Sequence, residues 1–375
     1  MRRLLLLGGG HAHVRVLTDF AAAPPASVEL RLVTPYRRQM YSGMVPGLVA
    51  GHYLEQDCVI PLAPLARAAG ARVVWSSATA LDAAARRVTL ADGSTLDYDL
   101  LSIDTGAEID RGRLAGAREH AVFVRPIEPF VRVLDDLAAR AAATALDVVF
   151  IGGGAAGVEL ALAFAFRQAG ARVALVTGGG EPLAGYPPAV MRHARRHLER
   201  RGVTVLRDAC AEVQPGSLRL AGGARVACDA AIVATGVDAP RWLASSGLAL
   251  DERGFVRTGA TLQSVSHANV FAAGDVATRD DAPHPKSGVY AVRAGPPLAL
   301  NLRRAAGGGD LVPYRPQRRS LNLVSCGGRR AIVSWGSVSA EGAWAWWWKD
   351  RIDRAFIARY ALPDEAAATG PSAGS

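Results

Sequence analysis

The sequence predicts an α/β protein with two doubly wound parallel sheets, and three observations support this prediction. Two glycine-rich turns, at residues 8–10 and 152–154, each follow an apolar run and precede a helical pattern. In that order of strand, turn and helix, the glycines let the backbone approach a pyrophosphate, and the helix N-terminus supplies N–H donors. A third turn, Gly274-Asp275, again follows an apolar strand. We therefore expect two Rossmann-like dinucleotide-binding domains, with the second inserted into the first.

The first unit alternates strands and helices in the order that a parallel sheet requires. Pro24 and Pro25 end its first helix, and Asp92-Gly93 is a turn signal between two later strands. Residues 35–51 are rich in Gly, Pro and Tyr, and we expect them to form a loop at the active site. The expected elements are a strand at residues 4–7, a helix at 13–21, and strands at 28–33, 72–75, 87–90 and 98–103.

The second unit begins at Asp147, after an expected helix at residues 130–143, and the chain then returns to the first unit. Its expected elements are strands at residues 148–151, 172–177, 204–206 and 230–234 and helices at 155–168 and 188–201; the return consists of a strand at 255–258, the apolar run before Gly274 and a helix at 289–300. A hairpin of residues 321–325 and 331–335 and a Trp-rich helix follow. The predicted domains are residues 1–120 and 241–306 for the first unit, 121–240 for the second, 307–362 for the C-terminal hairpin and helix, and 363–375 for a disordered tail.

The charge balance and the cysteine pattern narrow the classes of function. The chain carries 43 Lys and Arg against 34 Asp and Glu, a net charge of +9, much of it on arginines along helices. No nucleic-acid-binding motif accompanies this charge, so we expect no nucleic-acid partner. The apolar run at the start breaks at Gly8, which predicts a strand and not a signal peptide. The cysteines form no closely spaced pair, which predicts a reducing, cytoplasmic compartment; they are Cys58, Cys210, Cys228 and Cys326.

Five segments together resemble the flavoproteins that contain two dinucleotide-binding domains. They are residues 8–14, 41–47, 152–160, 269–275 and 348–354, which read GGGHAHV, YSGMVPG, GGGAAGVEL, NVFAAGD and WKDRIDR. The chain is similar to the type II NADH dehydrogenases and to the group of sulfide:quinone reductase and flavocytochrome c sulfide dehydrogenase. It resembles most the pyridine nucleotide-disulfide oxidoreductase-like proteins found fused to selenide, water dikinase. The resemblance implies FAD as cofactor, NADH or NADPH as substrate, and a quinone or another small molecule as electron acceptor.

The same resemblance assigns roles to individual residues. It places Asp275 at the ribityl and pyrophosphate region of the flavin, Lys286 at the N1–C2=O edge, where reduction leaves negative charge, and Glu159 near the nicotinamide and the isoalloxazine. Glu159 and Lys286 are therefore the candidate catalytic residues, while a first-turn glutamate and a surface lysine stay open as alternatives. The candidate cofactor-binding residues are Gly8, Gly10, His11, Ala12, Thr34, Tyr41, Ser42, Gly43, Met44, Thr105, Gly106, Gly152, Gly154, Gly157, Thr177, Thr235, Gly236, Gly274, Asp275, Lys286, Ser287 and Gly288.

Four departures from the family pattern bear on function. His13 stands where a third glycine is expected, so we expect looser packing between helix and strand there. Thr34 and Thr177 stand where an acidic residue would bind a ribose hydroxyl, which leaves the choice between NAD and NADP open. Val289 and Arg293 replace the glutamines of the quinone site, which leaves the acceptor open. Finally, the absence of a cysteine pair argues against disulfide reduction and against a cysteine relay for sulfide.

The C-terminal helix and one histidine pair leave further alternatives. Large apolar residues recur at four-residue steps, with the polar residues on other faces, which suits either a membrane interface or packing on the flavin domain. The apolar residues are Trp344, Trp348, Ile352, Phe356 and Tyr360, with Trp347 and Ala355 beside them; the polar residues are Lys349, Asp350, Asp353 and Arg354. His193 and His197 have the spacing of metal ligands, but no third ligand is near in sequence, so we expect a solvated helix face and no metal.

We therefore predict a cytoplasmic, FAD-dependent NAD(P)H oxidoreductase that passes electrons to a quinone or another small acceptor. Two other functions stay open: an oxidoreductase of sulfide or selenium compounds, with Cys58 or Cys326 as the candidate thiol, and a flavin-binding partner protein of selenium metabolism. The segment from Trp344 to Tyr360 leaves peripheral attachment to the inner face of the cytoplasmic membrane open, and a homodimer is also compatible with the sequence.

Overall fold

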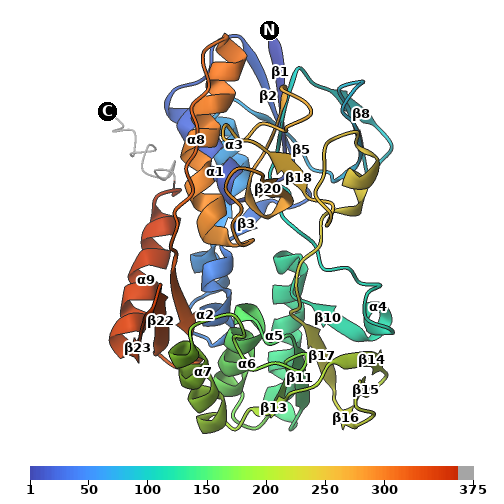
Figure 1. Cartoon of the computed structure of the whole chain (residues 1–375), viewed down its shortest axis with the longest axis vertical. Helices are drawn as coiled ribbons and strands as arrows, with labels where there is room; N and C mark the ends of the chain where they lie inside the picture. Colours follow the sequence, from blue (N-terminus) through green and yellow to red (C-terminus); the bar gives the residue numbers. More distant parts are fainter. Residues whose placement is uncertain (362–375) are drawn as a thin grey trace, which may run out of the picture.

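Two parallel five-stranded sheets organise the chain. The computed structural model describes residues 1–361, and the two sheets lie toward opposite ends of its long axis (Figure 1). The strand orders are β19-β9-β1-β2-β5 and β10-β17-β11-β12-β13, with every neighbouring pair parallel, which confirms the predicted fold class. The strands are β1 Arg2–Leu7, β2 Val28–Val33, β5 Arg72–Val74, β9 Leu100–Ile103 and β19 Val270–Ala272 in the first sheet, and β10 Ala121–Phe123, β11 Asp147–Ile151, β12 Arg172–Val176, β13 Thr204–Leu206 and β17 Ala230–Val233 in the second.

The first sheet is buried on both faces, which explains why residues 4–7 of β1 are continuously apolar. Leu4 and Leu6 pack into one core cluster with Phe20, whereas Leu5 and Leu7 point to the other face. Helices cover the first face and a three-stranded antiparallel sheet covers the second. The helices are α1 His11–Ala22, α3 Leu62–Ala68 and α8 Gly288–Gly307; the strands are β6 Ala78–Asp82, β7 Arg87–Leu90 and β8 Thr95–Asp97.

The second sheet carries its own helices and a small antiparallel sheet. Its strands share one core cluster with helix α6, and this cluster continues into the C-terminal sheet. The helices are α5 Ile127–Ala143, α6 Ala155–Arg167 and α7 Pro188–Arg200, and the small sheet consists of β14 Cys210–Gln214, β15 Ser217–Leu220 and β16 Arg225–Ala227. Shorter elements connect the units: β3 Arg38–Met40, α2 Val45–Val49, β4 Val59–Pro61, α4 Ala117–His120, β18 Val256–Thr258 and β20 Ala277–Arg279.

The C-terminal segment joins the two units. The predicted hairpin is confirmed as β21 Leu321–Ser325 and β22 Ala331–Trp335, and a third strand, β23 Val338–Gly342, leads directly into α9 Ala343–Ala358. Helix α9 runs along the side of the molecule (Figure 1). Trp346 near its start packs into the core of the second unit, whereas Phe356 near its end packs into the core of the first. The tail predicted at residues 363–375 lies outside the described residues.

Candidate functional site

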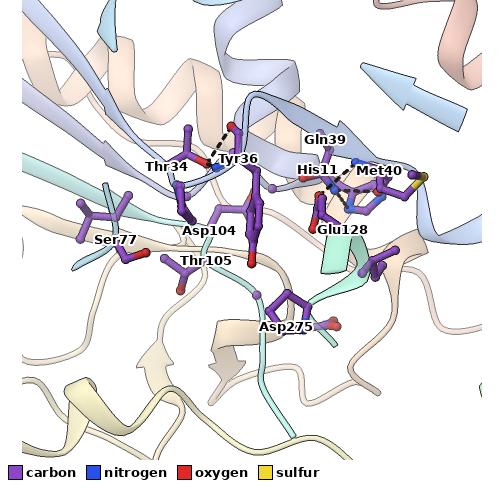
Figure 2. Close-up of a pocket in the computed structure, with 18 of the residues that line it drawn as sticks. His11, Thr34, Tyr36, Gln39, Met40, Ser77, Asp104, Thr105, Glu128 and Asp275 are labelled. Atoms are coloured by element: carbon purple, nitrogen blue, oxygen red, sulfur yellow. Dashed lines mark hydrogen bonds between the residues drawn. The ribbon is translucent and has the colours of Figure 1, made fainter. Parts of the chain in front are cut away.

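A cavity of about 380 Å³ lies at the carboxyl ends of β1, β2 and β9, which is where doubly wound sheets bind their ligands (Figure 2). Its wall combines segments that are far apart in the sequence, including the first glycine turn, the loop after β2, the end of β9 and the start of α8. The predicted cofactor-binding residues that line it are Gly8, Gly10, His11, Thr34, Ser42, Thr105, Gly106, Asp275 and Gly288.

The first glycine turn is shaped by close contacts that exclude side chains. A Cβ atom on Gly10 would lie 2.5 Å from Cγ of Asp104, and Gly8 has a φ of +90°, which favours glycine. His13 is fully buried, with Nδ1 2.6 Å from the carbonyl oxygen of Gly8 and Nε2 2.8 Å from Oγ of Ser102. The expectation of looser packing here is wrong, because the buried imidazole contacts both the carbonyl oxygen of Gly8 after β1 and the hydroxyl of Ser102 in β9.

Asp104 lies at the N-terminus of α1, inside the cavity wall. Its Oδ2 accepts hydrogen bonds from the backbone N–H groups of Ala12 at 2.8 Å and His13 at 2.9 Å. Burial raises the pKa of Asp104 to about 8, and these two hydrogen bonds oppose the rise only in part. Sequence reasoning named its neighbours Thr105 and Gly106 but missed Asp104. The available signal was a charged residue directly after a fully buried strand.

A cation from the second unit reaches the cavity. The guanidinium of Arg125, just before α5, lies 3.0 Å from Oδ2 of Asp275, and both residues line the cavity. Glu128 of α5 also lines it, and Figure 2 shows Glu128 beside Met40 and Gln39. Sequence reasoning missed Arg125 because it belongs to a linker whose path only the tertiary structure reveals.

Lys286 does not line the cavity. Its Nζ donates hydrogen bonds to the carbonyl oxygen of Ala277 and, at 2.8 Å, to Oγ1 of Thr278, and it lies 3.9 Å from the ring centre of Phe255. Burial lowers the pKa of Lys286 to about 8. These contacts give no support to the predicted catalytic role of Lys286. The start of α8 does line the cavity, through Gly288 and the next turn of the helix.

The loop that carries Tyr41, Ser42, Gly43 and Met44 forms one wall of the cavity. Ser42 lines the cavity, but the ring of Tyr41 stacks on Phe356 of α9, with ring centres 4.2 Å apart and an interplanar angle of 25°. Met44 is fully buried behind the loop. Tyr41 therefore contacts the C-terminal helix, and its predicted contact with the flavin stays a prediction.

Helix α9 holds this loop through a buried ion pair. Nζ of Lys349 lies 2.5 Å from Oδ2 of Asp353 and donates a hydrogen bond of 2.5 Å to the carbonyl oxygen of Gly43. Lys349 and Asp353 lie away from the apolar stripe, as expected, but both side chains are at least 89% buried because the helix turns this pair toward the loop. The predicted apolar stripe also divides: Phe356 and Tyr360 are buried, whereas Trp344, Trp348 and Ile352 are exposed.

A second nucleotide cradle lies at the carboxyl ends of β11, β12 and β17. A Cβ atom on Gly157 would overlap the carbonyl oxygen of Gly152, which brings α6 close to β11, whereas a Cβ atom on Gly154 would meet no atom within 4 Å. Thr177 packs against Gly153 and donates a hydrogen bond of 2.6 Å to the carbonyl oxygen of Gly180. Thr235 and Gly236 directly follow β17. This is the arrangement in which a doubly wound sheet binds the pyrophosphate of a dinucleotide.

Glu159 of α6 lies between the second unit and the C-terminal sheet. It is half-buried, and its Oε1 accepts a hydrogen bond of 2.7 Å from the backbone N–H of Ser325. Burial raises the pKa of Glu159 to about 7, although the positive charge of Lys349 opposes this rise. Its predicted position near the nicotinamide stays a prediction.

The cysteines and histidines do not form the sites that would support other chemistry. All four cysteines are free, and burial raises the pKa of each of them. The prediction of a solvated histidine pair is wrong for His197, which is buried and lies 2.8 Å from Oε2 of Glu341 because β23 packs against α7. Within residues 1–361, no cluster of His, Cys, Asp or Glu has the geometry to hold a metal ion, and none of the helices is long and apolar enough to span a membrane.

The first cavity fits FAD. Gly8, Gly9 and Gly10 line it at the N-terminus of α1 without side chains, and Nε2 of His11, which faces this cavity, is buried without a hydrogen-bond partner. Together with the second cradle, the site defines the class of flavoproteins that bind two dinucleotides. Residues 2–295 match the family described as pyridine nucleotide-disulphide oxidoreductase, so the chain belongs to this family. It is a flavin-dependent oxidoreductase that uses FAD and NAD(P)H.

Individual relatives agree with this assignment. The NADH dehydrogenase-like protein MT1860 of Mycobacterium tuberculosis is 28% identical over 304 residues, covering 74% of this chain and 73% of the relative. The demethylphylloquinone reductase NdbB of Synechocystis is 24% identical over 362 residues, covering 91% of this chain and 88% of the relative. The sulfide:quinone oxidoreductase of Aquifex aeolicus has the same fold, with a TM-score of 0.80 at 18% identity over 96% of this chain and 91% of the other. Two further relatives are matched over 58% of their own length. The predicted kinship with proteins fused to selenide, water dikinase stays a prediction.

Proposed function

We propose that this protein takes a hydride from NADH or NADPH at the second glycine turn and passes the electrons through FAD at the first turn to a quinone. The observation that carries the proposal is the pairing of two nucleotide cradles in a chain whose thiols are all free and have raised pKa values. The name of NdbB, a demethylphylloquinone reductase, supports a quinone as the acceptor.

The chain binds and orients, while FAD, when bound, supplies the hydride and electron-transfer chemistry. The glycines of the first turn admit the pyrophosphate, and Arg125 holds Asp275 in the wall of the cavity. The N-terminus of α8 at Gly288 directs the positive end of its dipole into the cavity, which stabilises negative charge there. The proposed reaction needs no thiol, which agrees with the burial of Cys58, Cys228 and Cys326.

Anaerobic reduction and a panel of acceptors test this proposal. We expect one FAD per chain after reconstitution, bleaching of the flavin band by NADH or NADPH, and reoxidation by a soluble quinone analogue. Ferredoxin, a disulfide and polysulfide are the competing acceptors in the same assay. A flavin that NAD(P)H does not reduce would contradict the hydride step, and reoxidation by a competitor alone would contradict the quinone.

We also propose that the outer face of α9 attaches the protein to an anionic membrane surface. Trp344, Trp347 and Trp348 are 53%, 54% and 42% exposed, and Ile352 is 40% exposed on the same helix. The guanidinium of Arg329 lies 5.7 Å from the ring centre of Trp347, so a cation borders the aromatic patch. Aromatic rings beside cations favour the interface of a membrane with anionic headgroups.

Vesicle sedimentation tests the attachment. Changing Trp344, Trp347 and Trp348 together to Ser should release the protein from phosphatidylglycerol vesicles, because each buried apolar side chain contributes about 1.5–3 kcal/mol. Turnover with a soluble acceptor should be unchanged. Phe356→Ser is the control, since Phe356 is buried and its loss should lower the melting temperature instead. Unchanged sedimentation of the triple variant would refute the attachment.

A further inference from the structure

The carboxylate of Asp104 occupies the N-terminus of α1 without a balancing cation. Asp104 is 3% exposed, and its Oδ2 accepts the N–H groups of Ala12 and His13, which belong to the first turn of the helix. The same carboxyl group lies against Gly10 and Gly274, where added Cβ atoms would lie 2.5 Å and 2.6 Å from its atoms. In the described part of the chain, Asp104 forms no ion pair.

The charged and titratable groups that face Asp104 do not neutralise it. His11 and His13 of α1 are neutral near pH 7, because burial lowers the pKa of each to about 4. Asp275, which follows β19, adds a second negative charge that raises the pKa of Asp104. The positive charge of Arg125 is paired with Asp275 at 3.0 Å. A bound anion would therefore meet an unbalanced carboxylate at this helix end.

On the proposed function, the pyrophosphate of FAD binds beside this carboxyl group, because Gly8, Gly9, Gly10 and Asp104 line the same cavity at the N-terminus of α1. Two anions that share one buried site cannot both keep their charge without a large cost, so one of them binds a proton. The phosphates of FAD are much stronger acids than a carboxylic acid. We propose that Asp104 is protonated whenever FAD is bound and takes up one proton on binding where it was ionised before, so that a neutral carboxyl group shares the helix N-terminus with the pyrophosphate. This inference rests on the proposed use of the cavity for FAD.

The proposal makes FAD affinity depend on pH in one direction. In the free protein, the pKa of Asp104 lies at about 8, so below this pH the carboxyl group is already neutral and the Kd for FAD is flat. Above this pH, Asp104 takes up one proton for each FAD that binds. The Kd for FAD then rises about tenfold per pH unit, until the pH reaches the pKa of Asp104 in the FAD-bound protein.

The experiment measures the Kd of the apoprotein for FAD by calorimetry between pH 6.5 and pH 9.5, roughly the window on either side of that pKa. At the alkaline end, two buffers of different ionisation enthalpy report the number of protons taken up, and we expect about one per FAD in the wild type. Asp104→Asn should bind FAD with a flat Kd and no proton uptake. The matched control, Asp99→Asn, changes an aspartate at the opposite end of β9 that pairs with Arg3, and it should keep the wild-type pH dependence.

Each outcome decides the proposal. A flat Kd and no proton uptake in the wild type would overturn it, and so would a slope that persists in Asp104→Asn, since another group would then be titrating. The wild-type calorimetry alone decides the matter if Asp104→Asn does not fold. Absence of FAD binding at every pH would refute the proposed function instead, so the two failures are distinguishable.

Discussion

Gly154 at the end of the second glycine turn and Gly157 in the first turn of α6 have different requirements, although they are three residues apart. A Cβ atom added to Gly154 would meet no other atom within 4 Å, whereas a Cβ atom added to Gly157 would overlap the carbonyl oxygen of Gly152. Gly154→Val should therefore fold and bind FAD but lose reduction by NAD(P)H, because the side chain blocks the path of the pyrophosphate. Gly157→Ala should instead lose about 1–3 kcal/mol of unfolding free energy or more. Rapid-reaction flavin reduction and thermal melting check both; normal reduction of Gly154→Val would exclude this turn as the NAD(P)H site.

Asp275 illustrates a residue whose role depends on the cavity around it. Asp275→Ala should weaken FAD binding by about tenfold or more, because it removes a charged hydrogen-bonding group and leaves Arg125 unpaired in the cavity wall. The matched control is Asp280→Ala, which removes a similar ion pair with Arg257 outside the cavity. The Kd for FAD checks the prediction, and equal losses in the two variants would count against a flavin contact.

At the scale of elements, α9 determines how the cavity wall is held. Lys349→Met should lower the free energy of unfolding by about 3–5 kcal/mol, because it leaves Asp353 as a buried, uncompensated charge. The double variant Lys349→Met/Asp353→Asn should recover most of this loss, since both charges are gone. An acceptor also remains for the hydroxyl of Tyr41, because burial and a hydrogen bond to Asp353 both raise the pKa of Tyr41 in the wild type. Urea unfolding measures both variants. A double variant as unstable as Lys349→Met would show that the Gly43 contact, and not the unpaired charge, dominates.

At the scale of the whole molecule, the proposed reaction passes electrons between two nucleotide sites and requires no thiol. A variant with all four cysteines changed to Ala should keep FAD and should oxidise NAD(P)H at a rate close to that of the wild type. The physical reason is that burial raises the pKa of Cys58 to about 12 and that of Cys228 to about 11, so these thiolates are rare at neutral pH. Loss of turnover in a folded, flavin-loaded variant would support the alternative sulfur or selenium chemistry.

The two sheets and both glycine turns could be predicted because their signals are local. A strand segment buried on both faces must be apolar, as residues 4–7 of β1 are, and a turn packed tightly against a neighbouring strand end must lack side chains, as at Gly8 and Gly10. The predicted hairpin after residue 320 was also local, since a short turn joins its strands. Thus the sequence by itself determined the fold class and the strand, turn and helix that surround each glycine turn.

Only the tertiary structure decided which charged groups enter the cavity. Arg125 reaches Asp275 across 150 residues of sequence, and Lys286 donates a hydrogen bond to the carbonyl oxygen of Ala277 outside the lining of the cavity. Helix periodicity likewise separated Lys349 from the apolar stripe but could not reveal that a distant loop offers it the carbonyl oxygen of Gly43. The position of a buried charge depends on partners that chain folding brings together, and such partners leave no periodic pattern in the sequence.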